Sequence, residues 1–168
     1  MYYEDFDFGL RTRMQGHTIL SVPRARCYHG PGTEGLALRS IGVYRSLRVY
    51  QTLADRWQVV LKNYQLRSLL LLAPILVTFE LMTIFGVVSK GWMTPWLRAV
   101  RSTMGQLPKI LSKRRVVQAS RRVPDREILE GGPIPFASQM ATSPVERAGR
   151  ALLEGMSSTY WHLVERWL

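Results

Sequence analysis

Cysteine is almost absent from this sequence, with Cys27 alone among 168 residues. A single cysteine excludes an internal disulfide and provides no cluster that could ligate zinc or an iron–sulfur group. We also expect no signal peptide, because the first residues are acidic and no continuous apolar run follows them. These absences are typical of a protein in a reducing, cytosolic compartment.

Acidic residues are scarce as well: the chain has 12 of them against 23 lysines and arginines, for a net charge of +11. The excess is concentrated in residues 90–126, where ten basic residues accompany Asp125 alone. Anionic lipid attracts such a block, because each basic residue near the surface contributes about 1 kcal/mol. Nucleic acid is the rival polyanion. No recognisable nucleic-acid-binding motif accompanies the charge, so we expect no such partner.

Residues 68–88 lack charge except for Glu80. This apolar segment has about the length of a bilayer-spanning helix, roughly 20 residues. Pro74 removes a backbone hydrogen bond and Glu80 places a charge near the middle, which argues against a simple straight span. A re-entrant hairpin or a shallow interfacial helix is the alternative, because either keeps both basic flanks on the cytosolic side.

The sequence after the apolar segment alternates aromatic or aliphatic residues with basic ones. This pattern predicts a basic amphipathic helix lying among lipid headgroups. Its candidate membrane-anchoring residues are Trp92, Trp96, Arg98 and Arg101. A loop rich in glycine and proline follows at 130–136, and the chain closes with a predicted helix over 145–168.

Between the N-terminus and the apolar segment, both strands and helices are expected. Thr18 to Val22 is β-branched and aliphatic and ends at Pro23, which predicts a strand, and a weaker strand is predicted over 25–29. Residues 29–35 form a glycine-rich loop. Apolar positions then recur every three or four residues over 40–64, predicting a long amphipathic helix. Its polar side carries Arg45, Arg48, Arg56 and Lys62.

The most informative stretch is the predicted helix over 4–15, which has three carboxylates in four positions: Glu4, Asp5 and Asp7. Gly9 lies one turn after Asp5 and has no side chain, so a substrate could reach the Asp5 carboxylate as a general base requires. A purely structural interpretation is that the acidic residues favour the helix dipole and that Asp7 pairs with Arg11.

The run YYEDFDFGLRTRMQGHTILSVP resembles the Glu-Asp motif region of family-two glycosyltransferases, especially the rhamnosyltransferase-like members. Phe8 departs from the leucine that is usual there. The resemblance continues through the glycine-rich loop after His29, the LKNY run and the apolar and basic tail, and so covers nearly the whole chain. The matching residues are Tyr3, Glu4, Asp5, Asp7, Arg11, Gly16 and Ile19.

This resemblance implies an α/β fold of the GT-A type followed by a mainly helical membrane-associated region. Residues 1–65 would be the C-terminal part of the catalytic domain, 66–90 a hydrophobic membrane segment, 91–126 a basic interfacial arm and 127–168 a loop and final helix. By the same resemblance Asp5 is the base that deprotonates the acceptor hydroxyl. Glu4, Asp7 and Arg11 shape the acceptor site, and His29 lies near the diphosphate or metal unless it is an ordinary, partly exposed histidine.

The implied partners are a nucleotide-sugar donor, a lipid-linked or polysaccharide acceptor and anionic lipid at the cytosolic face of the membrane. The resemblance also implies Mg or Mn in the full-length enzyme. The sequence has no Asp-x-Asp element for a metal-bound nucleotide sugar, so we expect this chain to lack the nucleotide-binding half and to be inactive alone. The alternative is a non-enzymatic basic membrane-binding module.

Overall fold

The computed structural model describes residues 3–26, 46–131 and 143–168, and every regular element in these ranges is helical. The predicted α/β fold is wrong for this part of the chain, which has no strand and forms an all-helical fold. The long helices are α1 (Glu4–Met14), α2 (Ser46–Asn63), α3 (Leu66–Ser89), α4 (Met93–Ala119) and α5 (Pro144–Val164). Short 3-10 turns are η1 (Asp125–Glu127) and η3 (Glu165–Trp167).

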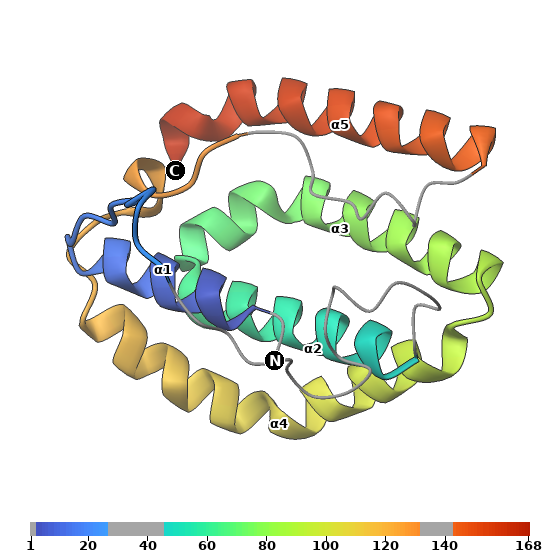
Figure 1. Ribbon diagram of the computed structural model, residues 1–168, viewed down its shortest axis with the longest axis horizontal. Helices are drawn as coiled ribbons and strands as arrows, with labels where there is room; N and C mark the ends of the chain where they lie inside the picture. Colours follow the sequence, from blue (N-terminus) through green and yellow to red (C-terminus); the bar gives the residue numbers. More distant parts are fainter. Residues whose placement is uncertain (1–2, 27–45, 132–142) are drawn as a thin grey trace.

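The four longest helices lie roughly side by side in the order α5, α3, α2, α4, and α3 runs opposite to its neighbours (Figure 1). The most extensive helix pair is α2 with α4, followed by α3 with α5. The short α1 packs on α2, on the side turned to the viewer. One end of the molecule therefore gathers the ends of α1, α2 and α4 together with η1 and η3.

Local signals explain where three of these helices begin or end. Gly16 has φ 85° and follows α1, and Gly91 has φ 70° in the turn between α3 and α4. Both lie in the left-handed region that glycine adopts without a steric penalty. The start of α5 has a capping box, in which the Ser143 side chain accepts from the Glu146 amide and the Glu146 carboxylate accepts from the Ser143 amide.

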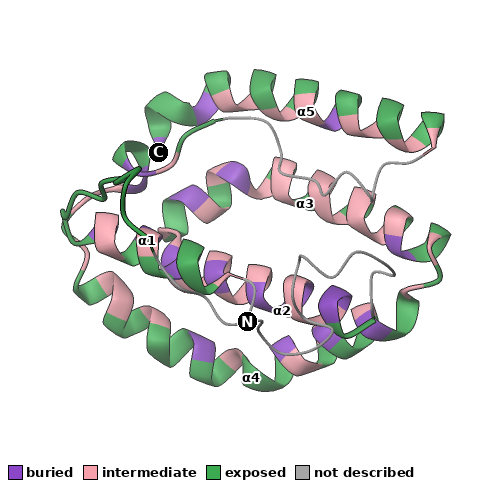
Figure 2. Ribbon diagram, in the orientation of Figure 1, coloured by how far each residue is buried: buried purple, intermediate pink, exposed green. Residues whose placement is uncertain are grey.

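Three small hydrophobic clusters hold the helices together, and buried positions are scattered along the helices in Figure 2. One joins α1 and α2 to η1, one joins α2 to α4, and one joins α3 to α5 and the C-terminus. Their buried members are Leu10, Met14, Val59 and Ile128 in the first, Val49, Leu53, Ala54 and Ala99 in the second, and Leu72, Val164 and Leu168 in the third.

The segment predicted to be a strand, Thr18 to Val22, is irregular and exposed. Its β-branched and aliphatic residues have no neighbouring strand in the described ranges, and a strand without a partner cannot satisfy its backbone hydrogen bonds. The segment instead lies over α1, where the Ile19 Cδ1 atom is 3.5 Å from the place a Cβ at Gly9 would take. Gly9 is therefore partly covered, and the other predicted strand lies mostly outside the described residues.

Helix α3 is long and apolar enough to cross a membrane by length and composition. Its 24 residues span about 36 Å at about 1.5 Å per residue. The apolar core helix of a soluble protein is mostly buried, whereas only 11% of the most apolar window of α3 is buried. Nine of its 24 residues are exposed and twelve are of intermediate burial, so the described parts of the chain cover α3 only in part.

Candidate active site on the first helix

The first turn of α1 presents two carboxylates to solvent. Glu4 and Asp5 are both exposed at the N-terminal end of the helix. Free backbone N–H groups and the helix dipole make this end favourable for negative charge. Exposed carboxylates at this position are open to solvent, and an accessible carboxylate is the kind of group that can accept a proton from a hydroxyl group.

Asp7, only two residues further on, has the opposite environment and is 4% exposed. The Lys62 Nζ atom lies 2.7 Å from Asp7 Oδ1, and the Arg11 Nε atom lies 3.0 Å from Asp7 Oδ2. The Asn63 amide also donates to Asp7, at 2.6 Å. Burial raises the pKa of Asp7, but the hydrogen bonds from Lys62 and Asn63 and the charges of Lys62 and Arg11 outweigh it, so the pKa is lowered.

Asp7 therefore anchors α1 to the C-terminal end of α2, while Asp5 stays free of these contacts. The pairing of Asp7 with Arg11 that the structural interpretation predicted is present. The contacts with Lys62 and Asn63 were not predicted. They mean that Asp7 holds the helix in place, whereas Glu4 and Asp5 are its exposed carboxylates.

The C-terminal end of α2 is in turn clamped by α4. The Arg114 guanidinium donates to the carbonyls of Leu61 and Tyr64 at 2.6 and 2.7 Å. The Gln118 amide donates to the carbonyls of Lys62 and Asn63 at 3.2 and 2.7 Å. Four consecutive carbonyls at a helix end, which have few intrahelical partners, are thus satisfied by two side chains of α4.

A buried carboxylate completes this clamp. Asp125 is 1% exposed and pairs with Arg121 at 2.8 Å, and Arg121 also donates to the Asn63 carbonyl. The Gln65 backbone amide donates to the Asp125 carboxylate at 2.6 Å, and the Gln65 side chain accepts from the Asp125 amide at 2.9 Å. Burial, together with the Asp125 charge, raises the pKa of Tyr64 to about 12. The turn between α2 and α3 is therefore fixed by charged and polar groups on every side.

The end of α1 is tied to the same region. The backbone amides of Arg122 and Val123 donate to the Met14 carbonyl at 2.8 and 3.1 Å. The Arg13 guanidinium reaches back to the carbonyls of Glu127 and Ile128 at 3.3 and 3.2 Å. Helix α1 is therefore held through Asp7 near its start and through Met14 at its end.

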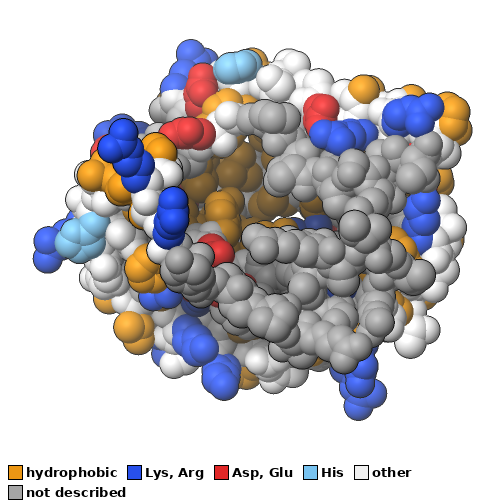
Figure 3. All heavy atoms as spheres, viewed as in Figure 1, with side chains coloured by type: hydrophobic (Ala, Val, Ile, Leu, Met, Phe, Trp, Pro, Cys, Tyr) orange, Lys and Arg blue, Asp and Glu red, His pale blue; other side chains and the backbone are white. Residues whose placement is uncertain are grey.

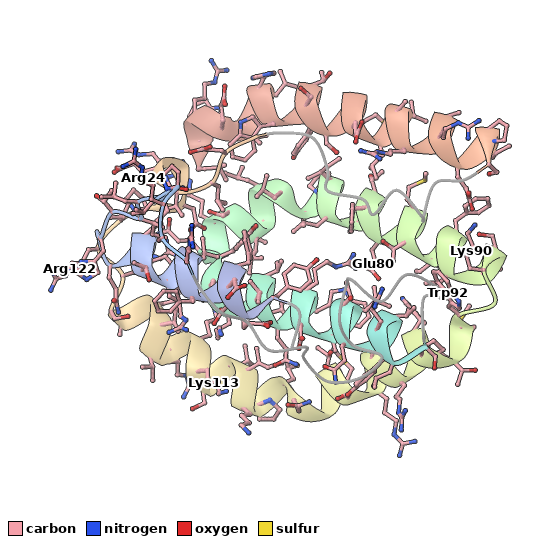
Figure 4. All side chains as sticks on the ribbon, in the orientation of Figure 1. Arg24, Glu80, Lys90, Trp92, Lys113 and Arg122 are labelled. Carbon is pink, nitrogen blue, oxygen red and sulfur yellow. The ribbon has the colours of Figure 1, made fainter. Side chains whose placement is uncertain are left out.

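Glu80, the charge within the apolar helix, is fully partnered by α2 and α4. It forms an ion pair with Arg56, and the Trp57 and Trp96 indoles donate to it at 3.0 and 3.4 Å. Burial lowers the pKa of Arg56, and the Glu80 charge opposes this effect. Figure 4 labels Glu80 where α3 faces α2. The position of Glu80 in an apolar segment already indicates, from the sequence, that a cationic partner lies elsewhere in the chain.

The predicted membrane-anchoring residues divide into two groups. Trp92 and Trp96 are partly buried against the cluster that joins α2 to α4, and Figure 4 labels Trp92 at the turn between α3 and α4. Arg98 and Arg101 are exposed on α4, and the Arg98 guanidinium lies 5.7 Å from the centre of the Tyr50 ring. His29 lies outside the described residues.

A hollow between α3 and α5 lies on the same face of the molecule as α1, and Figure 3 shows hydrophobic side chains at its bottom. Its volume is about 1040 Å³, and Leu72, Ile75, Leu76 and Phe79 of α3 contribute to its wall. A second cavity of about 340 Å³ shares Phe79 and extends to Tyr3, the residue before Glu4. Apolar space thus reaches the start of α1.

Within the described ranges, no three His, Cys, Asp or Glu side chains are grouped so that they could hold a metal ion. Comparisons of the chain with models of protein families, with curated proteins and with solved structures found no match. The functional interpretation therefore depends on the residues of α1 and on what surrounds them.

Proposed function

We propose that this chain is part of an inverting glycosyltransferase of the family-two type that acts at the cytosolic face of the membrane. The observation that carries the proposal is the contrast between two carboxylates of α1. Asp5 is exposed at the helix N-terminus, while Asp7 is buried and binds Lys62 and Asn63 of α2. The type of reaction is inferred from the sequence resemblance to the Glu-Asp motif. The structure supports it because the Asp5 carboxylate is accessible and lies on a helix that other contacts hold in place.

In this proposal Asp5 removes the proton from an acceptor hydroxyl as its oxygen attacks the anomeric carbon of a nucleotide sugar. The nucleoside diphosphate leaves from the opposite side of the ring, so the configuration inverts. Glu4 lies beside Asp5 and contributes to the acceptor site, whereas Asp7 and Arg11 act by positioning the helix.

A lipid-linked saccharide or a growing polysaccharide is the proposed acceptor. Two features support an acceptor that carries a lipid. The weakly covered apolar helix α3 is suited to a membrane, and apolar space extends from α3 to Tyr3 at the start of α1. An acceptor anchored in the membrane would present its saccharide on the aqueous side, where the Asp5 carboxylate is exposed.

The direct test is sugar transfer from a panel of nucleotide sugars to membrane lipid extracts, by the chain expressed together with any in-frame sequence that its gene encodes before Met1. Asp5→Asn keeps the side-chain size and removes its basicity, and we expect turnover to fall by about 10²–10⁴-fold. Near-normal turnover of the Asp5→Asn enzyme would show that Asp5 is not the base.

A non-enzymatic membrane-binding module is the second candidate, because the exposed apolar surface of α3 serves membrane binding whether or not the protein catalyses a reaction. The genomic sequence upstream of Met1 separates the two candidates. An in-frame continuation that encodes an Asp-x-Asp element favours the enzyme, whereas a stop codon there favours the module.

A further inference from the structure

One face of α3 is apolar and exposed over almost its whole length. The positions follow each other at intervals of four or three residues, which places them on one side of a helix. The side chains that make up this stripe, called here the α3 stripe, are Leu66, Leu70, Pro74, Val77, Leu81, Phe85 and Val88. Six of them are large hydrophobics that are 56% to 67% exposed.

The neighbouring helix α5 extends this apolar surface. Leu152, Met156 and Leu163 are 64%, 47% and 62% exposed. These three residues line a shallow groove between the helices together with Pro74 of the α3 stripe. The exposed apolar residues of α3 and α5 thus form one continuous surface.

This surface faces away from α1. Helix α1 packs on the viewer's side of α2 in Figure 1, and α3 turns mainly buried and intermediate residues to the same side in Figure 2. The exposed stripe therefore lies on the opposite face. A flat surface that contacted lipid through α3 and α5 would leave Glu4 and Asp5 on the aqueous side.

The ion pair of Glu80 argues against a helix that crosses the membrane. It joins the middle of α3 to Arg56 in the middle of α2, and α2 packs along α4. If α3 crossed the bilayer, α2 and α4 would lie at the same depth, and the exposed Arg98 and Arg101 would meet hydrocarbon. Charged side chains are expensive at that depth. With α3 parallel to the surface, these arginines stay among headgroups or in water.

We infer that α3 and α5 lie in the plane of an anionic lipid leaflet, with the α3 stripe in the outer acyl region, and that no helix of the described residues crosses the bilayer. The basic surplus of residues 90–126 matches the negative charge of such a leaflet. Amphipathic helices bound in this way penetrate only about 5–10 Å. The inference rests on the membrane location proposed above and is independent of the sugar-transfer chemistry.

The depth of each position in the leaflet tests this inference directly. The full chain with Cys27→Ser provides a cysteine-free background, because Cys27 is the single native cysteine. Single variants Leu70→Cys, Val77→Cys and Val88→Cys would carry an environment-sensitive fluorophore. Vesicles of phosphatidylglycerol and phosphatidylethanolamine in equal amounts would contain lipids brominated at a shallow or a deep carbon.

We expect shallow quenching of equal strength at all three positions and no quenching of a fluorophore at Gln15→Cys, beyond the end of α1. A depth that changes along the helix, deepest at Val77, would show that α3 crosses or re-enters and would overturn the inference while leaving sugar transfer untouched. The inference would also be overturned if a second copy of the chain shielded the fluorophores, which chemical cross-linking would reveal as dimers. Failure of the chain to float with any vesicle would overturn the membrane location itself.

A matched pair of substitutions gives an independent readout. Val77→Asp places a charge in the α3 stripe, and Val22→Asp places the same charge outside the basic block, in the segment that lies over α1, where Val22 is 60% exposed. We expect vesicle binding to weaken about tenfold or more for Val77→Asp and to change little for Val22→Asp. Equal effects of the two substitutions would contradict the assignment of the lipid surface to α3 and α5.

Discussion

Asp5 and Asp7 are two residues apart on one helix, and replacing each with asparagine should have opposite consequences. Asp7→Asn keeps an acceptor for the Asn63 amide but removes the charge that Lys62 contacts at 2.7 Å. A hydrogen bond to a charged group contributes about 1.5–3 kcal/mol. The pair with Arg11 adds below about 1 kcal/mol, because the Arg11 side chain is 44% exposed and solvent screens it.

We therefore expect Asp7→Asn to lower the free energy of unfolding by about 2–3 kcal/mol. Asp5→Asn changes an exposed side chain, and its effect on stability should stay within about 0.5 kcal/mol. Urea unfolding of both variants and the parent chain, followed by far-ultraviolet circular dichroism in one mild detergent, measures both values. In the sugar-transfer assay we expect Asp5→Asn to have the larger effect on turnover, since it removes the proposed base.

Two results would refute this reasoning. An unchanged urea midpoint for Asp7→Asn would mean that Asp7 does not fasten α1 to α2. A destabilised Asp5→Asn variant would mean that Asp5 is itself structural, and any loss of turnover could then follow from a displaced helix. A parent-like midpoint combined with lost turnover is the signature of a carboxylate that acts on the substrate.

Acidification should destabilise the chain through Asp7, because the pKa of Asp7 is lower in the folded state than its ordinary value of 3.8. The contribution of Asp7 to the free energy of unfolding is therefore full above that ordinary value and is lost as the pH falls through the folded-state pKa. Unfolding free energies measured from pH 6 to pH 2 should show this loss in the parent chain, and Asp7→Asn should flatten it. Arg121→Ala breaks the ion pair with the buried Asp125 and should lower the free energy of unfolding by about 3–5 kcal/mol. Arg122→Ala is the control, because Arg122 is exposed and its loss should change stability by about 0.5 kcal/mol or less. Equal urea midpoints of the two variants would contradict a stabilising role for the Arg121–Asp125 pair. Glu80→Ala should loosen α3 from α2 and speed amide hydrogen exchange near residue 80, and unchanged exchange would contradict a fixing role for Glu80.

The helices could be predicted from the sequence because their signals are local. Gly16 ends α1 as expected, and the spacing of apolar residues predicted a helix over 40–64, which α2 confirms for Ser46–Asn63; residues 40–45 lie outside the described part of the chain. The prediction of a strand at Thr18 to Val22 was wrong. Strand propensity describes how well a residue fits into a sheet, and no sheet is present in the described ranges. A strand needs a partner, which composition alone does not supply.

The polar contacts were the least predictable part of the candidate site. Arg48, Arg56 and Lys62 were expected to line a polar side of α2, yet Arg48 is 4% exposed and the other two pair with carboxylates on other helices. Periodicity shows that these residues share a polar side but cannot show that another helix covers it. Glu80 is different, since a charge in an apolar segment is costly unless another group in the chain compensates it.

Helix α2 links the proposed membrane surface to the proposed active site. Its Arg56 holds Glu80 of α3, and its Lys62, six residues later, holds Asp7 of α1. Six residues of α-helix span about 9 Å. Because α4 also clamps the end of α2, the position of α1 relative to the proposed lipid-facing helices is set by one short stretch of helix. An enzyme that acts on a lipid-linked acceptor needs its catalytic group held in a constant position relative to the leaflet, since the hydroxyl group of the acceptor lies at a set distance from it.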